Sequence, residues 1–236
     1  YDPAKVPTIE QSLRGFQVRA QDTTRNPTEP EPGAILMGDD DPEAVALLDK
    51  ENEGIRTGGE NALGYKGLSS TLAPERHREG WLTAKALDYL DARNPQSDDP
   101  FFLYISFNKP HAALNVPEEF ESMYNIDDIV LPQNPVSLNE LADHYVQPRN
   151  VEEWRIWREA FSVEDQKRSL LRYYASCTYV DNLCGQLLDK IKAMGELDNT
   201  FVIFTADHGD SLGERYRFSK YSLYEGSVRV PLIVSG

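Results

Sequence analysis

Apolar residues recur every three or four positions in two long stretches of the chain, and they gather into short unbroken runs elsewhere. Residues 74–93 carry an apolar stripe that runs from Trp81 to Leu90, and residues 164–195 carry a similar stripe. This spacing places the apolar side chains on one face and predicts two amphipathic helices. Gly195 is expected to end the second helix, because glycine readily takes the left-handed conformation that follows helix termini.

Three apolar runs predict β-strands. The runs 101–107 and 201–206 are rich in aromatic and β-branched residues, a composition typical of strands that are buried on both faces. The run 228–234 contains Pro231, which lacks the N–H that a ladder needs and therefore indicates an edge strand or a bulge. Strands that alternate with long helices favour a layered α/β/α fold with a mainly parallel central sheet.

Residues 22–64 differ from the rest of the chain in their high content of Pro, Gly and acidic residues. We interpret them as a long surface insertion within a single α/β domain that spans residues 1–236. One short helix is expected at 42–50, because Asp41 can cap it and Pro42 suits the first helical position.

The composition is that of a folded protein with an acidic surface. The 236 residues are 40% hydrophobic, which allows a sizeable core, and they carry a formal net charge of −15. Such acidity argues against a nucleic-acid partner, because phosphate backbones require clustered Lys and Arg. No apolar run in the sequence approaches the roughly 20 residues that are needed to cross a membrane.

Cys177 and Cys184 are the only cysteines, and they lie seven positions apart on the second predicted helix. Their Cα atoms should be about 10 Å apart at the helical rise per residue, which is too far for a disulfide. They are expected to be buried free thiols on the core face of the helix. Cysteine usage therefore does not identify the compartment, and periplasmic, secreted and cytoplasmic locations all stay open.

Chemically active side chains follow two of the predicted strands. Lys109 and His111 come after the first strand, and Asp207 and His208 come directly after the second, with Lys220 further along the same loop. Because the carboxyl ends of parallel strands lie at the same edge of a sheet, these side chains are expected to meet there. Asp and neutral His suit a divalent cation, whereas Lys and His can hold an anionic ester oxygen or protonate a leaving group.

Four segments occur in a fixed order: 100–111 with Lys109-Pro110-His111, 173–181, 199–214 with Asp207-His208-Gly209, and 220–234. In this order they resemble the sulfatases, a family within the alkaline phosphatase superfamily. The resemblance covers residues 80–236 well and residues 1–75 poorly. It implies an alkaline-phosphatase-like α/β fold.

The resemblance also implies a catalytic domain, that of a sulfuric ester hydrolase acting on aryl or carbohydrate sulfate monoesters. Asp207 and His208 would be two ligands of a divalent metal, usually Ca²⁺ in sulfatases. A His where the family often has Asn leaves Mn²⁺ and Zn²⁺ open. His111 would contact the sulfate ester and could protonate the leaving oxygen. Lys220 would neutralise a sulfate oxygen, and Lys109 would be a further substrate contact.

Two parts of the family's site are missing from the sequence. The nucleophile of sulfatases is a formylglycine, made from the Cys or Ser of a Cys/Ser-x-Pro/Ala-x-Arg motif, and neither Cys177 nor Cys184 lies in such a motif. The run Asp39–Asp41 does not replace the family's pair of strand-end Asp residues, because no predicted strand precedes it. We therefore expect the formylglycine upstream of Tyr1, a fold that is incomplete at both ends, and no activity of these residues alone.

Two other functions stay open. A phosphonate or phosphate ester hydrolase of the same superfamily would combine a Thr or Ser nucleophile with zinc or manganese, whereas a modifiable Cys with calcium favours sulfate. A non-catalytic binding module would keep the fold without the chemistry. The expected partner is a small-molecule or saccharide sulfate ester, and no motif identifies its organic part or the oligomeric state.

Overall fold

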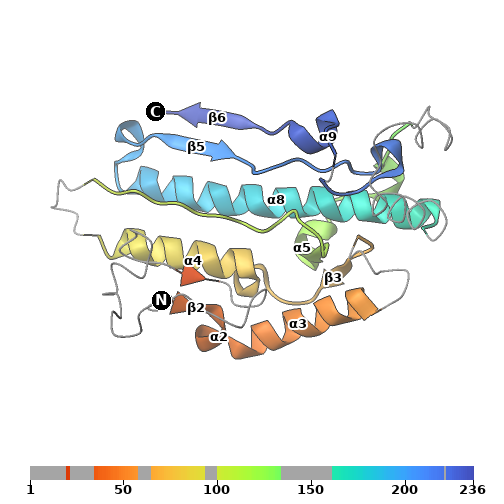
Figure 1. Ribbon diagram of the computed structural model, residues 1–236. Coiled ribbons are helices and arrows are strands. Elements are labelled where there is room, and N and C mark those ends of the chain that lie inside the picture. The colour runs from red at the N-terminus through yellow and green to blue at the C-terminus, as the bar shows by residue number, and fades with distance from the viewer. Residues whose placement is uncertain (1–19, 22–34, 58–64, 94–99, 134–160, 221) are drawn as a thin grey trace, which may run out of the picture.

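The long helix α8 lies between a pair of strands, β5 and β6, and the helix α4 (Figure 1). The computed structural model describes residues 20–21, 35–57, 65–93, 100–133, 161–220 and 222–236. In chain order its elements are β1 (Ala20–Gln21), β2 (Ile35–Leu36), α2 (Met37–Asp40), α3 (Pro42–Thr57), β3 (Leu68–Ser70), η2 (Pro74–Arg76), α4 (Arg78–Asp91), β4 (Asn115–Pro117), α5 (Glu118–Glu121), η3 (Ile126–Asp128), α8 (Val163–Ala193), η4 (Leu197–Asn199), β5 (Val202–Thr205), η5 (Glu214–Tyr216), α9 (Glu225–Val228) and β6 (Leu232–Ser235).

Helix α8 confirms the longer of the two predicted helices, and both of its ends are capped. Ser162 and Asp165 form a reciprocal capping box, in which each side chain accepts a hydrogen bond from the other residue's backbone N–H. Gly195 follows the last turn at a φ of 75° and donates its N–H to the carbonyl of Lys192 at 2.9 Å. No helix in the described part of the chain combines the length and apolar content of a membrane span.

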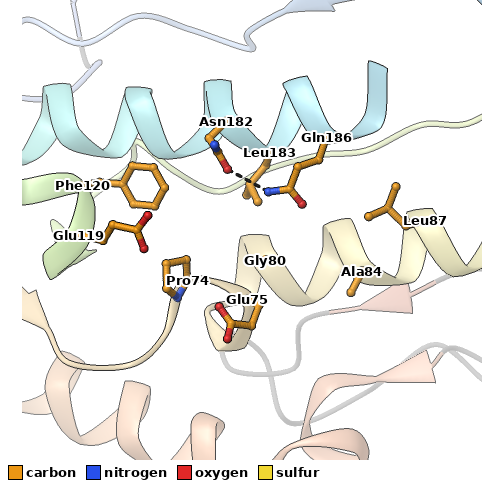
Figure 2. A pocket seen from close by; sticks show the side chains of 10 residues that line it. All are labelled: Pro74, Glu75, Gly80, Ala84, Leu87, Glu119, Phe120, Asn182, Leu183 and Gln186. Carbon is orange, nitrogen blue, oxygen red and sulfur yellow. Dashed lines mark hydrogen bonds between the residues drawn. The ribbon is translucent and has the colours of Figure 1, made fainter. Parts of the chain in front are cut away.

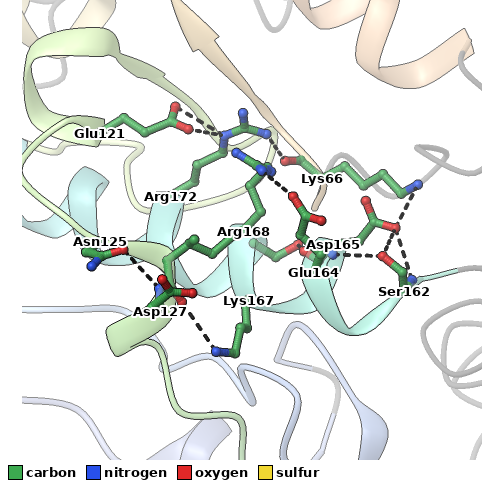
Figure 3. Close-up of polar contacts among 12 residues, drawn as sticks. Lys66, Glu121, Asn125, Asp127, Ser162, Glu164, Asp165, Lys167, Arg168 and Arg172 are labelled. Atoms are coloured by element: carbon green, nitrogen blue, oxygen red, sulfur yellow. Dashed lines mark hydrogen bonds and ion pairs between the residues drawn. The ribbon is translucent and has the colours of Figure 1, made fainter.

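Polar contacts fasten the first half of α8 to three neighbouring segments (Figure 3). The Arg172 guanidinium lies 3.1 Å from the Glu121 carboxylate and donates to the carbonyl of Lys66 at 2.5 Å. Lys167 donates to the carbonyl of Ile126 at 3.4 Å. These bonds fix α5, η3 and the segment before β3 on the helix that carries the core.

The strands form three described pairs. The pairs β1–β2 and β3–β4 are parallel, in agreement with the predicted mainly parallel α/β fold, whereas β5 pairs antiparallel with β6. Strand β5 confirms the predicted strand at 201–206, and β6 begins directly after Pro231. Of the predicted last strand, Val228 ends the short helix α9, and residues 229–231 form no strand.

The expectation of buried strands is wrong at two places. Residues 101–107 are extended but pair with no described strand, and Phe102 and Tyr104 are 73% and 68% exposed. In β5, Ile203 is 65% exposed. The physical reason is the same in both segments, because no described element covers the faces from which these side chains project.

Part of the predicted insertion packs into the core. Helix α3 is longer than the predicted 42–50, and its start is capped as expected, since the Asp41 carboxylate accepts the N–H of Ala44 at 3.0 Å. Met37 and Leu48 are buried in a cluster that also contains Trp81 of α4. The described part of 22–64 therefore contacts the domain through apolar side chains.

Both cysteines are free, as predicted, but their predicted burial is wrong. Cys177 is exposed and Cys184 is half-buried. They lie on the same stripe of α8 as Tyr174 and Leu188, which are also exposed. The helical spacing was identified correctly, but no described element packs closely on that stripe.

His77 is a buried histidine that the sequence pattern does not single out. Burial, together with the nearby ammonium of Lys109 and guanidinium of Arg78, lowers the pKa of His77 from 6.5 to about 3. The ring is therefore neutral in the folded protein at mildly acidic pH, where an unfolded chain would bind a proton.

Acid is expected to destabilise the fold through His77. Between pH 7 and pH 5 the unfolded state takes up a proton that the folded state does not, so the free energy of unfolding should fall by about 2 kcal/mol. Above the ordinary His pKa of about 6.5 neither state binds this proton, so the burial of His77 then causes no such loss of stability. Urea unfolding at pH 7 and pH 5 measures this fall in the free energy of unfolding. In the His77→Gln variant the fall should be smaller by about 2 kcal/mol. The same pH dependence in both proteins would contradict a buried neutral His77.

Candidate active site after strand β5

The loop after β5 brings together three of the predicted site residues. Asp207 and His208 follow the strand directly, and the Lys220 ammonium lies 2.6 Å from Nε2 of His208. Oδ2 of Asp207 lies 3.5 Å from the same nitrogen. A carboxylate, an imidazole and an ammonium therefore share one small volume at the carboxyl end of the strand.

The ring of His208 is oriented by the backbone carbonyl of the next residue, Gly209. Its Nδ1 lies 2.7 Å from the carbonyl oxygen of Gly209, which can only accept a hydrogen bond, so this nitrogen carries the proton. In the neutral ring Nε2 then presents its lone pair toward Lys220. This tautomer is also the one in which a histidine binds a metal through Nε2.

Asp210 organises the loop, and the sequence reading gave it no role. Its Oδ1 accepts the N–H of Leu212 at 2.9 Å and of Ser219 at 3.0 Å. Both of those residues have left-handed backbone conformations, with φ of 45° and 76°. Burial raises the pKa of Asp210, although the two N–H groups and the positive charges nearby act in the opposite direction. Asp often accepts the backbone N–H two residues further on, as in an Asx turn, and this local preference could have identified Asp210.

A cluster of serines joins the loop to α9. Ser227 accepts the N–H of Gly209 on its carbonyl at 2.8 Å, and its hydroxyl lies 3.2 Å from Ser211 and 2.8 Å from Ser222. Gly209 itself has no room for a side chain, since an added Cβ would lie 2.1 Å from the carbonyl oxygen of Gly226. These contacts fold the loop back on itself, so that Lys220 lies next to His208.

Removal of the Asp210 side chain is expected to loosen this loop. Asp210→Ala leaves two backbone N–H groups without their acceptor and should lower the free energy of unfolding by about 1–3 kcal/mol. Asp210→Asn keeps an oxygen acceptor and should cost clearly less. Thermal or urea unfolding of the two variants measures the difference. An equal loss in both would indicate that the charge of Asp210, and not its hydrogen bonds, stabilises the loop.

The other two predicted site residues lie in the loop after residues 101–107. His111 donates its N–H to the carbonyl of Asn108 at 3.0 Å, and its Nδ1 contacts the carbonyl of Ala112. Lys109 is largely buried, and its ammonium donates to the carbonyl of Ala113 at 2.5 Å. The Lys109 side chain is therefore engaged within its own loop.

The two loops meet in one part of the core. Ala112 and Leu114 of the first loop and Leu212 and Phe218 of the second pack in the same apolar cluster, together with Leu170 and other residues of α8. In Figure 1 the extended segment before the first loop runs in the same direction as β5. His111 and Lys109 thus come from a loop that shares core contacts with the loop of Asp207, His208 and Lys220.

The donor chemistry of this loop fits a divalent cation in part. Asp207 offers carboxylate oxygens, and His208 offers an imidazole nitrogen whose other nitrogen is hydrogen-bonded, as in many metal sites. The lone pair of its remaining nitrogen, Nε2, faces the Lys220 ammonium at 2.6 Å, so a metal at this nitrogen would take the place of that contact. Within the described residues no group of three or more His, Cys, Asp and Glu is placed to hold a metal ion. Further ligands would have to come from other residues.

A separate cavity of about 260 Å³ lies between α4, α5 and α8 (Figure 2). Its rim includes Asn182 and Gln186, whose side chains are hydrogen-bonded at 2.9 Å. None of the five predicted site residues lines it. The lining residues are Pro74, Glu75, Gly80, Ala84, Leu87, Glu119, Phe120, Asn182, Leu183 and Gln186.

Comparisons with known proteins match the chain to one family. Residues 40–236 match the family model described as Sulfatase. An arylsulfatase of Clostridium perfringens (strain 13 / Type A) is 31% identical over 158 residues, which are 67% of this chain and 32% of that protein. The human iduronate 2-sulfatase is 31% identical over 163 residues, 64% of this chain and 29% of that protein. The chain therefore spans about a third of the length of the curated relatives it matches.

A solved structure shares the fold. The phosphonate monoester hydrolase of Silicibacter pomeroyi superposes with a TM-score of 0.63 at 18% identity, covering 97% of this chain and 52% of that one. At this identity the likeness is one of fold. It agrees with the predicted alkaline-phosphatase-like architecture.

Proposed function

Because the chain belongs to the sulfatase family, we propose that it forms part of the active site of an enzyme that hydrolyses sulfate monoesters, with aryl or carbohydrate sulfates as substrates. The observation that carries the proposal is the Lys220 ammonium 2.6 Å from Nε2 of His208, beside the Asp207 carboxylate at the end of β5. In such a set of side chains, the carboxylate and the imidazole can bind a cation while the ammonium binds an anionic ester next to it.

Four of the five predicted site residues receive a direct role in this proposal. Lys220 neutralises a sulfate oxygen, and His111 protonates the oxygen of the leaving group. Asp207 and His208 would hold the divalent metal, with Ca²⁺ as first choice and Mn²⁺ or Zn²⁺ as alternatives. When bound, the metal would supply Lewis-acid polarisation of the ester. The tautomer that the Gly209 carbonyl imposes on His208 keeps Nε2 available for either the metal or the Lys220 ammonium.

We place the nucleophile, a formylglycine, outside these 236 residues. The apolar surface of the strands supports a larger protein around this chain. Phe201, which directly precedes β5, and Ile203 and Val234 of the β5–β6 pair are exposed by 60% or more, and two strands alone are marginally stable in water. Further strands would pair with the edges of β5 and β6, and elements packed on their faces would cover these side chains.

Phosphonate or phosphate ester hydrolysis is the second candidate. One solved structure with a similar fold is a phosphonate monoester hydrolase. In addition, His208 stands where sulfatases often have Asn, and an imidazole suits Zn²⁺ or Mn²⁺ as well as or better than Ca²⁺. The two candidates use the same proposed site and differ in the anion that the site turns over.

Side-by-side hydrolysis assays on the full-length protein test the proposal. The substrates are 4-nitrophenyl sulfate, a 4-nitrophenyl phosphonate monoester and 4-nitrophenyl phosphate, each assayed with Ca²⁺, Mn²⁺ or Zn²⁺. We expect the highest kcat/KM for the sulfate. A higher kcat/KM for the phosphonate or phosphate would favour the second candidate, and no hydrolysis of any of them would indicate a binding module.

A further inference from the structure

The loop that carries His111 is closed across its base. It begins at Asn108 and returns to the sheet at β4, where Asn115 pairs with Leu68 of β3. The backbone N–H of Lys109 donates to the buried carboxylate of Glu79 at 3.2 Å. His111 therefore lies at the tip of a short loop whose two ends are held by α4 and β3.

The side chain of Lys109 spans this loop from one end to the other. Its ammonium donates to the carbonyl of Ala113 at 2.5 Å and to the side-chain oxygen of Asn115 at 2.7 Å. Only 8% of the residue is exposed. Burial of an ammonium is costly unless acceptors replace its water, and these two acceptors do so inside the loop.

The acceptor side of the bridge is itself fixed. The Asn115 amide donates to one oxygen of the Glu51 carboxylate at 3.2 Å, and the other oxygen of Glu51 accepts the hydroxyl of Ser70 at 2.8 Å. The amide oxygen of Asn115 is thereby directed at Lys109. A chain of bonds runs from α3 through β3 and β4 to the base of the loop.

We propose that Lys109 is a positioning residue that closes the 109–115 loop and so presents His111, and that it does not contact the substrate. The proposal rests on the proposed function, in which His111 protonates the leaving oxygen. A lysine that binds the sulfate would have its ammonium directed toward the ester, whereas this ammonium is buried against Ala113 and Asn115.

The two roles predict different kinetics. If Lys109 positions a general acid, its loss reduces kcat for esters with poor leaving groups, which need protonation, and spares esters whose leaving group departs as a stable phenolate. If Lys109 binds the sulfate, its loss raises KM for both kinds of ester alike. Double substitution with His111 separates the roles again, because groups that act as one unit give non-additive losses.

The experiment compares Lys109→Met, His111→Ala and the double variant of the full-length protein on 4-nitrophenyl sulfate and on a simple alkyl sulfate. For Lys109→Met we expect a roughly 10–100-fold loss of kcat on the alkyl sulfate, about threefold or less on the nitrophenyl ester, and little change in KM. The double variant should be no worse than His111→Ala alone. Asn115→Ala, which removes one acceptor of the bridge, should give the same pattern in weaker form and serves if Lys109→Met does not fold.

Lys85→Met is the matched control, because the Lys85 ammonium is also paired, with Asp40 at 2.8 Å, but lies on α4 away from the loop. It should leave both rates unchanged. A rise in KM on both esters, or losses that multiply in the double variant, would overturn the positioning role while the proposed function stands. No sulfate release by the unaltered protein would overturn the proposed function, and the positioning role with it.

Discussion

Replacement of Lys220 by Ala in the full-length protein is expected to lower kcat/KM for sulfate ester hydrolysis by about 10²–10³-fold. The Lys220 ammonium lies beside His208 and Asp207 at the carboxyl end of β5. In the proposed function its charge stabilises the negative oxygens of the sulfate in the transition state. Steady-state assays with 4-nitrophenyl sulfate measure the loss, and Lys220→Arg should retain more activity because it keeps the charge.

Lys190→Ala is a suitable control for this substitution. Lys190 also pairs with an acidic residue, Asp91, but near the carboxyl end of α8 and at the surface. Exposed pairs of this kind contribute little to stability, so kcat/KM should be unchanged. A Lys220→Ala protein that is as active as the Lys190→Ala protein would remove Lys220 from the site.

Replacement of Tyr179 by Ala is expected to cause the largest loss of stability, about 3–5 kcal/mol. Tyr179 of α8 is fully buried, its ring lies 5.0 Å from that of Phe120, and its hydroxyl donates to the carbonyl of Pro74 at 2.5 Å. The substitution removes a large ring from the contact between α8, α5 and α4 and leaves a cavity. Urea unfolding measures the change.

Tyr174→Ala on the same helix provides the comparison. Its ring is partly exposed, so the same truncation should cost much less. Tyr179→Phe keeps the ring and loses only the hydrogen bond to Pro74, for a loss of about 1–2 kcal/mol. Similar losses for Tyr179→Ala and Tyr174→Ala would contradict the packing described for α8.

The helices were the part of the fold that sequence pattern predicted well. Periodicity located α8 and α4, and Gly195 and Asp41 marked a helix end and a helix start because their local chemistry is sufficient for those roles. Strand β5 was located by composition alone. These features depend on residues that are close in sequence, which is why a single sequence is enough to predict them.

Features that depend on distant partners were not predictable in the same way. An apolar stripe indicates which face a helix would bury, but not whether a neighbour covers it, and so Cys177 was expected to be buried. Lys109 follows the predicted strand 101–107, as a substrate-binding lysine would, yet its ammonium is bonded to Asn115 and Ala113. Likewise the bond from Ser219 to Asp210 and the bond between Ser222 and Ser227 are contacts that sequence spacing does not specify.

The most direct test of the account is calcium binding by the full-length protein after treatment with a chelator, measured by titration calorimetry together with recovery of sulfate release. We expect the unaltered protein to bind Ca²⁺ and to regain activity. Asp207→Ala and His208→Ala should bind Ca²⁺ at least about tenfold more weakly, since calcium affinity follows the number and charge of its ligands. Unchanged calcium affinity and full activity in both variants would contradict a metal-dependent sulfatase site at the end of β5.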